Sequence, residues 1–74
     1  MSHPEIMRTT VVSSLLSSIA YSVDETLELE FRSGSIYRYF AVPQAVFEDL
    51  IAAVSKGAYF NHNVRNRFRY QRLA

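Results

Sequence analysis

The fold is decided by the stretch TLELEFRSGSIYRYFA, residues 26–41. In its first half, apolar side chains alternate with charged ones, so that Leu27, Leu29 and Phe31 share one face. This period of two is typical of a half-buried β-strand. Gly34 tolerates the positive φ of a tight reversal, and the residues after it are rich in aromatic side chains, which favour a strand. The stretch therefore predicts an antiparallel hairpin.

The length of the hairpin loop sets which residues face one another. A two-residue loop would place Arg38 opposite Leu29, on the apolar face. A three-residue loop over 32–34 pairs Leu29 with Tyr37 and Glu28 with Arg38. The second register gives an apolar face and an opposite-charge pair worth about 0.5 kcal/mol. We therefore expect Tyr37 on the core face and Arg38 on the other face.

The segments around the hairpin extend this fold. Alternation over residues 18–23 predicts a strand before it. Pro43 suits the first turn of a helix, and a helix over 43–55 is expected to end before Gly57. Its apolar residues recur at helical spacing, and they are Val46, Phe47, Leu50, Ile51 and Val54.

The C-terminal part continues with two short elements. Residues 59–64 predict a short helical turn, and alternation over 67–71 predicts a final strand with Phe68 and Tyr70 facing inward. The expected fold class is α+β: a small antiparallel three-stranded meander packed on one amphipathic helix, with the short C-terminal helical turn and strand. Residues 1–10 are expected to be a flexible N-terminal segment, and residues 11–74 a single domain.

Composition limits the class of protein. A chain of 74 residues makes one domain, and without cysteine its core depends on packing alone. The absence of cysteine fits a cytoplasmic location. No stretch approaches the roughly 20 apolar residues of a membrane span, so no membrane partner is expected.

Charge divides the chain into two parts. The first 54 residues carry three arginines and seven acidic side chains, a net charge of −4, whereas residues 55–74 carry five cations and no acid. Aromatic side chains are interleaved with these cations, and they are Tyr59, Phe60, Phe68 and Tyr70. Such a mixture can hold phosphates and stack on bases. The cations could equally neutralise acids of the sheet, or meet an acidic partner protein.

Catalysis and metal binding have little support. The two histidines, His3 and His62, lie in no nucleophile or zinc motif, and no glycine-rich phosphate loop is present. We therefore expect no enzyme activity, no metal and no cofactor.

The leading hypothesis is a weak RNA-binding domain. Phosphate contacts are expected from Lys56, Arg65, Arg67, Arg69 and Arg72. Base contacts are expected from Arg38 together with Tyr59, Tyr70 or Phe40. The alternative is a homodimer or protein-interaction module that uses Ile36 and Phe40 as an apolar patch. Tyr37 and Tyr39 could be core or site residues, with core favoured.

Most of the chain resembles the KTSC domain family. The matching residues are Ser13-Ser14, Ile19, Tyr21, Leu27-x-Leu29-x-Phe31-x-Ser33-Gly34, Tyr37-x-Tyr39, Val42-Pro43-x-x-Val46-Phe47-x-x-Leu50, Ser55-x-Gly57, Tyr59-Phe60-Asn61-x-x-Val64-Arg65, Phe68-x-Tyr70 and Arg72-Leu73. This family occurs at the C-terminus of some lysyl-tRNA synthetases and as small bacterial proteins. The resemblance implies no defined activity, and it suggests RNA binding by association only.

Overall fold

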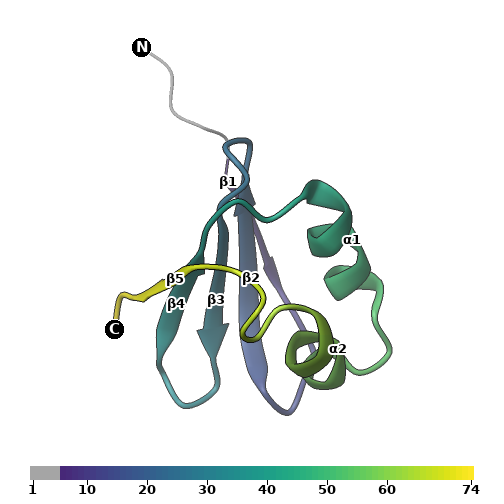
Figure 1. Cartoon of the computed structure of the whole chain (residues 1–74). Helices are drawn as coiled ribbons and strands as arrows, with labels where there is room; N and C mark the ends of the chain where they lie inside the picture. Colours follow the sequence, from purple (N-terminus) through teal and green to yellow (C-terminus); the bar gives the residue numbers. More distant parts are fainter. Residues whose placement is uncertain (1–5) are drawn as a thin grey trace.

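The computed structural model describes residues 6–74, which form an antiparallel sheet and two helices (Figure 1). The elements are β1 (Ile6–Thr10), β2 (Leu16–Ser22), β3 (Leu27–Phe31), β4 (Ile36–Tyr39), α1 (Gln44–Ala52), α2 (Lys56–Asn63) and β5 (Tyr70–Arg72). The five strands follow one another in the sheet in chain order. The α+β class is therefore confirmed, although the meander has five strands instead of the three we expected.

The register of the central hairpin is the predicted one. Leu29 pairs with Tyr37 and Glu28 with Arg38. The loop spans 32–34, where Gly34 has a φ of 97°. Only a residue without Cβ adopts that backbone conformation at no steric cost. The apolar face and the charged face of β3 and β4 are therefore fixed by the turn.

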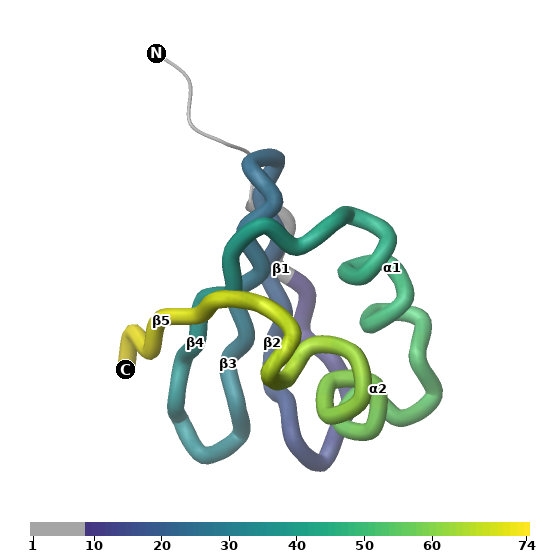
Figure 2. Tube along the Cα trace, viewed as in Figure 1, coloured from purple at the N-terminus to yellow at the C-terminus, as the bar shows by residue number. Residues whose placement is uncertain are grey.

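Both helices pack on the same face of the sheet (Figure 2). The ring of Tyr21 in β2 stacks on Phe47 of α1, with centroids 4.8 Å apart. The ring of Phe31 in β3 meets Phe60 of α2 edge-on at 5.4 Å. The fully buried side chains between these layers are aliphatic, and they are Leu16, Ile19, Leu27, Leu29, Val42, Leu50 and Val64. One hydrophobic core thus holds both helices against the sheet.

The other face of the sheet carries charged and small side chains. Arg38 donates to Glu28 at 3.3 Å, which is the cross-strand pair the register predicted. Ser18 donates to the carboxylate of Glu30 at 3.0 Å. No helix of the described residues covers this face (Figure 1).

The N-terminal expectation needs a correction. We expected residues 1–10 to be a flexible segment, but residues 6–10 form β1 and pair with β2 along its length. Residues 1–5 lie outside the described part of the chain. A short strand at the edge of a sheet is specified mainly by the strand it joins, so local pattern alone does not reveal it.

The helical region also differs from the expectation. The predicted turn over 59–64 is a full helix, α2, because Ser55 caps it by accepting a hydrogen bond from the Ala58 amide at 3.2 Å. The chain must leave α1 before that cap, so α1 ends at Ala52 and Val54 is fully exposed. Gly57 lies inside α2 instead of ending α1.

The last strand is shorter than predicted. Residues 64–67 form a turn in which the Arg67 amide donates to the Val64 carbonyl at 3.1 Å, and the strand begins only at Tyr70. Phe68 is half-buried against the core, and Tyr70 lies on the same face of the sheet as Tyr37 and Tyr39, as predicted, although 57% of it is exposed. Neither helix of the described residues is long and apolar enough to span a membrane.

Candidate functional site

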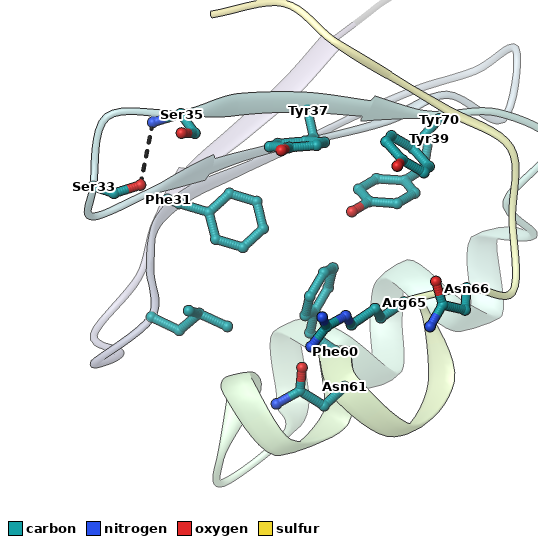
Figure 3. A pocket seen from close by; sticks show the side chains of 11 residues that line it. Phe31, Ser33, Ser35, Tyr37, Tyr39, Phe60, Asn61, Arg65, Asn66 and Tyr70 are labelled. Atoms are coloured by element: carbon teal, nitrogen blue, oxygen red, sulfur yellow. Dashed lines mark hydrogen bonds between the residues drawn. The ribbon is translucent and has the colours of Figure 1, made fainter.

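An open pocket of about 560 Å³ lies between the helix-bearing face of the sheet and α2 (Figure 3). The sheet provides one wall, α2 provides the opposite wall, and the segment that leads into β5 closes one end. The lining residues are Leu15, Phe31, Ser33, Ser35, Tyr37, Tyr39, Phe60, Asn61, Arg65, Asn66 and Tyr70. Such a volume is within the range of roughly 300–1,000 Å³ found for small-molecule sites.

Four aromatic rings of the lining contact one another in a closed cycle. Phe31 and Tyr37 have centroids 5.6 Å apart, and Tyr37 and Tyr39 are 6.4 Å apart. Phe60 completes the cycle at 6.0 Å from Tyr39 and 5.4 Å from Phe31. Its ring is steeply inclined to both partners, at 73° and 78°. Each ring is thereby held in place by its neighbours, which gives the pocket rigid apolar walls.

Tyr70 adds a fifth, more accessible ring. The pairing of β5 with β4 sets Tyr70 opposite Tyr39. Its ring centroid lies 5.6 Å from that of Tyr37 and 5.7 Å from that of Tyr39. Because 57% of Tyr70 is exposed, this ring can receive a flat ligand from solvent.

The electrostatics of the pocket are one-sided. Among the described residues that line the pocket, Arg65 is the only charged one and none is a carboxylate. Arg72 lies nearby, with its guanidinium 5.9 Å from the centre of the Tyr37 ring. Arg72 also donates to the Ser35 hydroxyl at 3.3 Å. The site therefore favours neutral or anionic ligands over cations.

Tyr39 provides a hydroxyl that stays protonated. Burial, reinforced by the neighbouring Tyr37 and Tyr70, raises the pKa of Tyr39 to about 12, and Arg65 acts in the opposite direction. At neutral pH this hydroxyl is therefore a hydrogen-bond donor as well as an acceptor.

Comparison with known proteins identifies the family. The model of the KTSC domain matches residues 12–68. The chain belongs to the KTSC domain family. The crystal structure of a KTSC domain protein from Yersinia pestis matches with a TM-score of 0.90 and 31% identity, and the match covers 95% of this chain and 100% of that chain. The expected resemblance is thus confirmed.

Curated relatives of this KTSC domain are of two kinds. A lysine–tRNA ligase of Nostoc sp. is 52% identical over 50 residues, which are 68% of this chain and 9% of the ligase. A similar ligase of Trichormus variabilis is 47% identical over 53 residues, again 9% of its length. An uncharacterized protein of Stutzerimonas stutzeri is 41% identical over 68 residues, 89% of this chain and 96% of that protein. This KTSC domain therefore spans about a tenth of the ligases it matches.

The structure brings some of the predicted site residues together. Arg65 and Tyr70 line the pocket, and Arg72 adjoins it. Arg67 and Arg69 are exposed on the segment between α2 and β5. These five residues all lie within residues 65–72, and we call them the basic-aromatic segment.

Three predicted site residues lie elsewhere. Arg38 pairs with Glu28 on the opposite face of the sheet, beside Phe40 in a shallow hollow. The ammonium group of Lys56 donates to the Ala53 carbonyl at 3.0 Å at the start of α2. Tyr59 faces α1, where burial and then Asp49 raise its pKa. These three side chains do not meet at the pocket, because the hairpin directs Arg38 to the opposite face of the sheet and α2 directs Tyr59 toward α1.

Sequence reasoning missed several lining residues and left two open. Phe31 lines the pocket from β3, Ser33 and Ser35 line it from the connection between β3 and β4, and Phe60 and Asn61 reach it from α2. The predicted hairpin register already placed Phe31, Tyr37 and Tyr39 on one face, so the sheet wall of the pocket could be predicted from the sequence. Tyr37 and Tyr39 turn out to be both core-facing and pocket-lining, since Tyr39 is buried and Tyr37 half-buried. In the part of the chain that the structure describes, no group of three or more potential ligands could hold a metal ion.

Proposed function

We propose that this KTSC domain is a non-catalytic domain that binds single-stranded RNA weakly through its basic-aromatic segment. The observation that carries the proposal is Arg65 at an aromatic pocket whose lining contains no carboxylate. Further positive charge comes from Arg67 and Arg69, on the exposed chain that leads into β5, and from Arg72 in β5 itself. Cations beside accessible rings are the combination that grips a backbone and stacks on bases.

The physics of phosphate binding sets the expected strength. Four arginines neutralise at most about four phosphates, which gives weak and salt-sensitive binding. For a single strand, the slope of log affinity against log salt should change by about 0.7 for each phosphate contact. Arg38 and Lys56 are left out of this proposal because their side chains are engaged away from the pocket.

The relatives add support from a different direction. Two of them are lysine–tRNA ligases, and the matched region is 9% of each. A small domain in such an enzyme can supply an extra RNA contact, which agrees with the chemistry of the basic-aromatic segment. This support rests only on the association with tRNA ligases, whereas the residues of the pocket give a physical reason for RNA binding.

A titration of labelled single-stranded RNA over a series of salt concentrations tests the proposal. We expect binding at low salt that weakens steeply as salt rises. Arg65→Gln should reduce the salt slope by about 0.7. The matched control is Arg38→Gln, which removes the same charge from the opposite face and should leave the slope unchanged. Absence of binding at low salt, or equal effects of the two variants, would contradict the proposal.

A second candidate is a homodimer or protein-interaction module. The observation that favours it is the sheet face without a helix, where Phe40 borders a hollow of about 280 Å³. Ile36 and Phe40 are half-buried there, so the apolar surface they offer is small. Light scattering across a concentration series separates the candidates, because a concentration-dependent dimer without RNA affinity favours this second one.

A further inference from the structure

We infer that the aromatic pocket holds one unstacked nucleobase of a nucleoside phosphate, with the phosphate on Arg65. The inference deepens the proposed function and relies on it for the source of the nucleotide. It concerns what the pocket itself holds, whereas the proposed function concerns RNA binding along the whole basic-aromatic segment, of which Arg65 and Tyr70 belong to the pocket. The two can therefore be tested separately.

The walls of the pocket suit a flat ring. Phe31, Tyr37 and Tyr39 come from the sheet and Phe60 from α2, and Phe60 contacts Phe31 and Tyr39 edge-on, so these rings form one joined aromatic surface against which a base can stack (Figure 3). The volume of about 560 Å³ exceeds what a water molecule or a methyl group would need and falls in the range of small-ligand sites. Stacking on aromatic rings tolerates any base, because each base has a π-face.

The polar groups of the pocket match the edge of a base. Figure 3 shows Asn61 of α2 and Arg65 of the turn after α2 on the side of the pocket opposite Tyr37 and Tyr39. Amide and hydroxyl groups both donate and accept hydrogen bonds, as the edge of a base requires. Ser33 and Ser35 place further hydroxyls at the hairpin end of the pocket.

The charge of the pocket selects against the main competing ligand. A cage of aromatic rings is also the usual site for a quaternary ammonium group. Here the lining offers Arg65, which repels a cation, and no carboxylate to balance it. A ring that carries a phosphate satisfies both the aromatic walls and the guanidinium, whereas an organic cation satisfies only the walls.

NMR titration of the isotope-labelled protein with small probes tests this inference. The probes are adenosine monophosphate, uridine monophosphate, ribose 5-phosphate and choline. We expect both nucleotides to shift the amide signals of Tyr37, Phe60 and Arg65. Ribose 5-phosphate, which lacks a base, should bind at least tenfold more weakly, and choline should leave these signals unchanged.

A pocket-filling variant provides the control for charge. Asn61→Trp places a ring in the pocket from an exposed position of α2 and leaves every arginine in place. It should abolish the nucleotide shifts. Tyr70→Ala should weaken nucleotide binding about tenfold, the effect of losing one stacking partner.

The outcomes separate the two proposals. If RNA binds but the nucleotides cause no shifts in the pocket, or if Asn61→Trp retains them, the pocket inference is wrong and the proposed function stands. If the nucleotides bind in the pocket but RNA shows no salt-dependent binding, the pocket is a mononucleotide site and the proposed function is wrong. Equal binding of ribose 5-phosphate and adenosine monophosphate would also overturn the inference.

Discussion

The hydroxyl of Tyr21 donates a 2.6 Å hydrogen bond to the backbone carbonyl of Val42. Tyr21 lies in β2, whereas Val42 lies in the connection between β4 and α1. Both residues are buried, and the Tyr21 ring also stacks on Phe47. One side chain thus fixes the start of α1 against the sheet through a polar and an apolar contact.

Replacing Tyr21 with Phe should destabilise the domain. The ring can still stack on Phe47, but the buried Val42 carbonyl loses its donor, and an unsatisfied buried group costs about 1–3 kcal/mol. Urea denaturation followed by circular dichroism measures the loss. Tyr70→Phe is the control, because its hydroxyl lies on a largely exposed side chain and should change stability by less than about 0.5 kcal/mol. Equal effects of the two variants would contradict this role of Tyr21.

The middle and the C-terminal end of the predicted apolar stripe should respond differently to truncation. Leu50 is completely buried, so Leu50→Ala should lower the free energy of unfolding by about 2–5 kcal/mol. Val54 has the same aliphatic character but is fully exposed, and Val54→Ala should stay within about 0.5 kcal/mol of the wild type. Thermal and urea denaturation of both variants provide the comparison. A large loss for Val54→Ala would mean that α1 extends beyond Ala52.

The two glycines should respond in opposite directions to alanine. Gly34 has a φ of 97° with open space around it, so Gly34→Ala should cost about 1–2 kcal/mol for conformational reasons alone. Gly57 lies in α2, where an added Cβ would meet Leu15 at an ordinary 3.5 Å. Gly57→Ala should therefore stabilise the protein by up to about 1 kcal/mol. Differences in melting temperature test the pair, and a shift of the same sign in both would be inconsistent with the structure.

Alkaline pH should weaken the fold through Tyr39. Its pKa is raised from 10.0 to about 12, so the folded protein holds this proton more tightly than the unfolded chain does. The contribution of Tyr39 is therefore complete below about pH 10 and disappears as the pH rises toward about 12. Urea denaturation across this pH range, compared with Tyr39→Phe, isolates the effect. The wild type should lose more stability than the variant over that interval, and parallel curves would argue against burial of the hydroxyl.

The central hairpin could be predicted because its signals are local. Alternation in β3, the reversal at Gly34 and the charges of Glu28 and Arg38 all favour one register, which the structure has. The end of α1 was harder to predict, because Val54 continues the apolar spacing although the chain has already left the helix. Ser55 was the available signal, since its side chain caps α2.

The candidate site was predictable only in part, because distance along the chain does not give distance in space. Arg65 and Tyr70 were named from composition and do share the pocket. Arg38 was named as a base contact together with Tyr59, Tyr70 or Phe40, although the predicted register, which the structure has, already placed it on the face opposite Tyr37. Phe60 joins those tyrosines only after α2 has packed on the sheet, and no local pattern encodes that meeting.

The order of the strands in the sheet has a consequence for how this domain can be used. Each strand pairs with the strand next to it in the chain, and the pairings among β1 to β4 close short loops that cost little chain entropy, whereas residues 40–69 separate β4 from β5. Local pairings form quickly, so the four-stranded part of the sheet can form before β5 has to meet it. A domain that forms mainly through local pairings can fold without waiting for a larger protein that is joined to it. This agrees with its relatives, because the matched region is 9% of a lysine–tRNA ligase and 96% of a small protein.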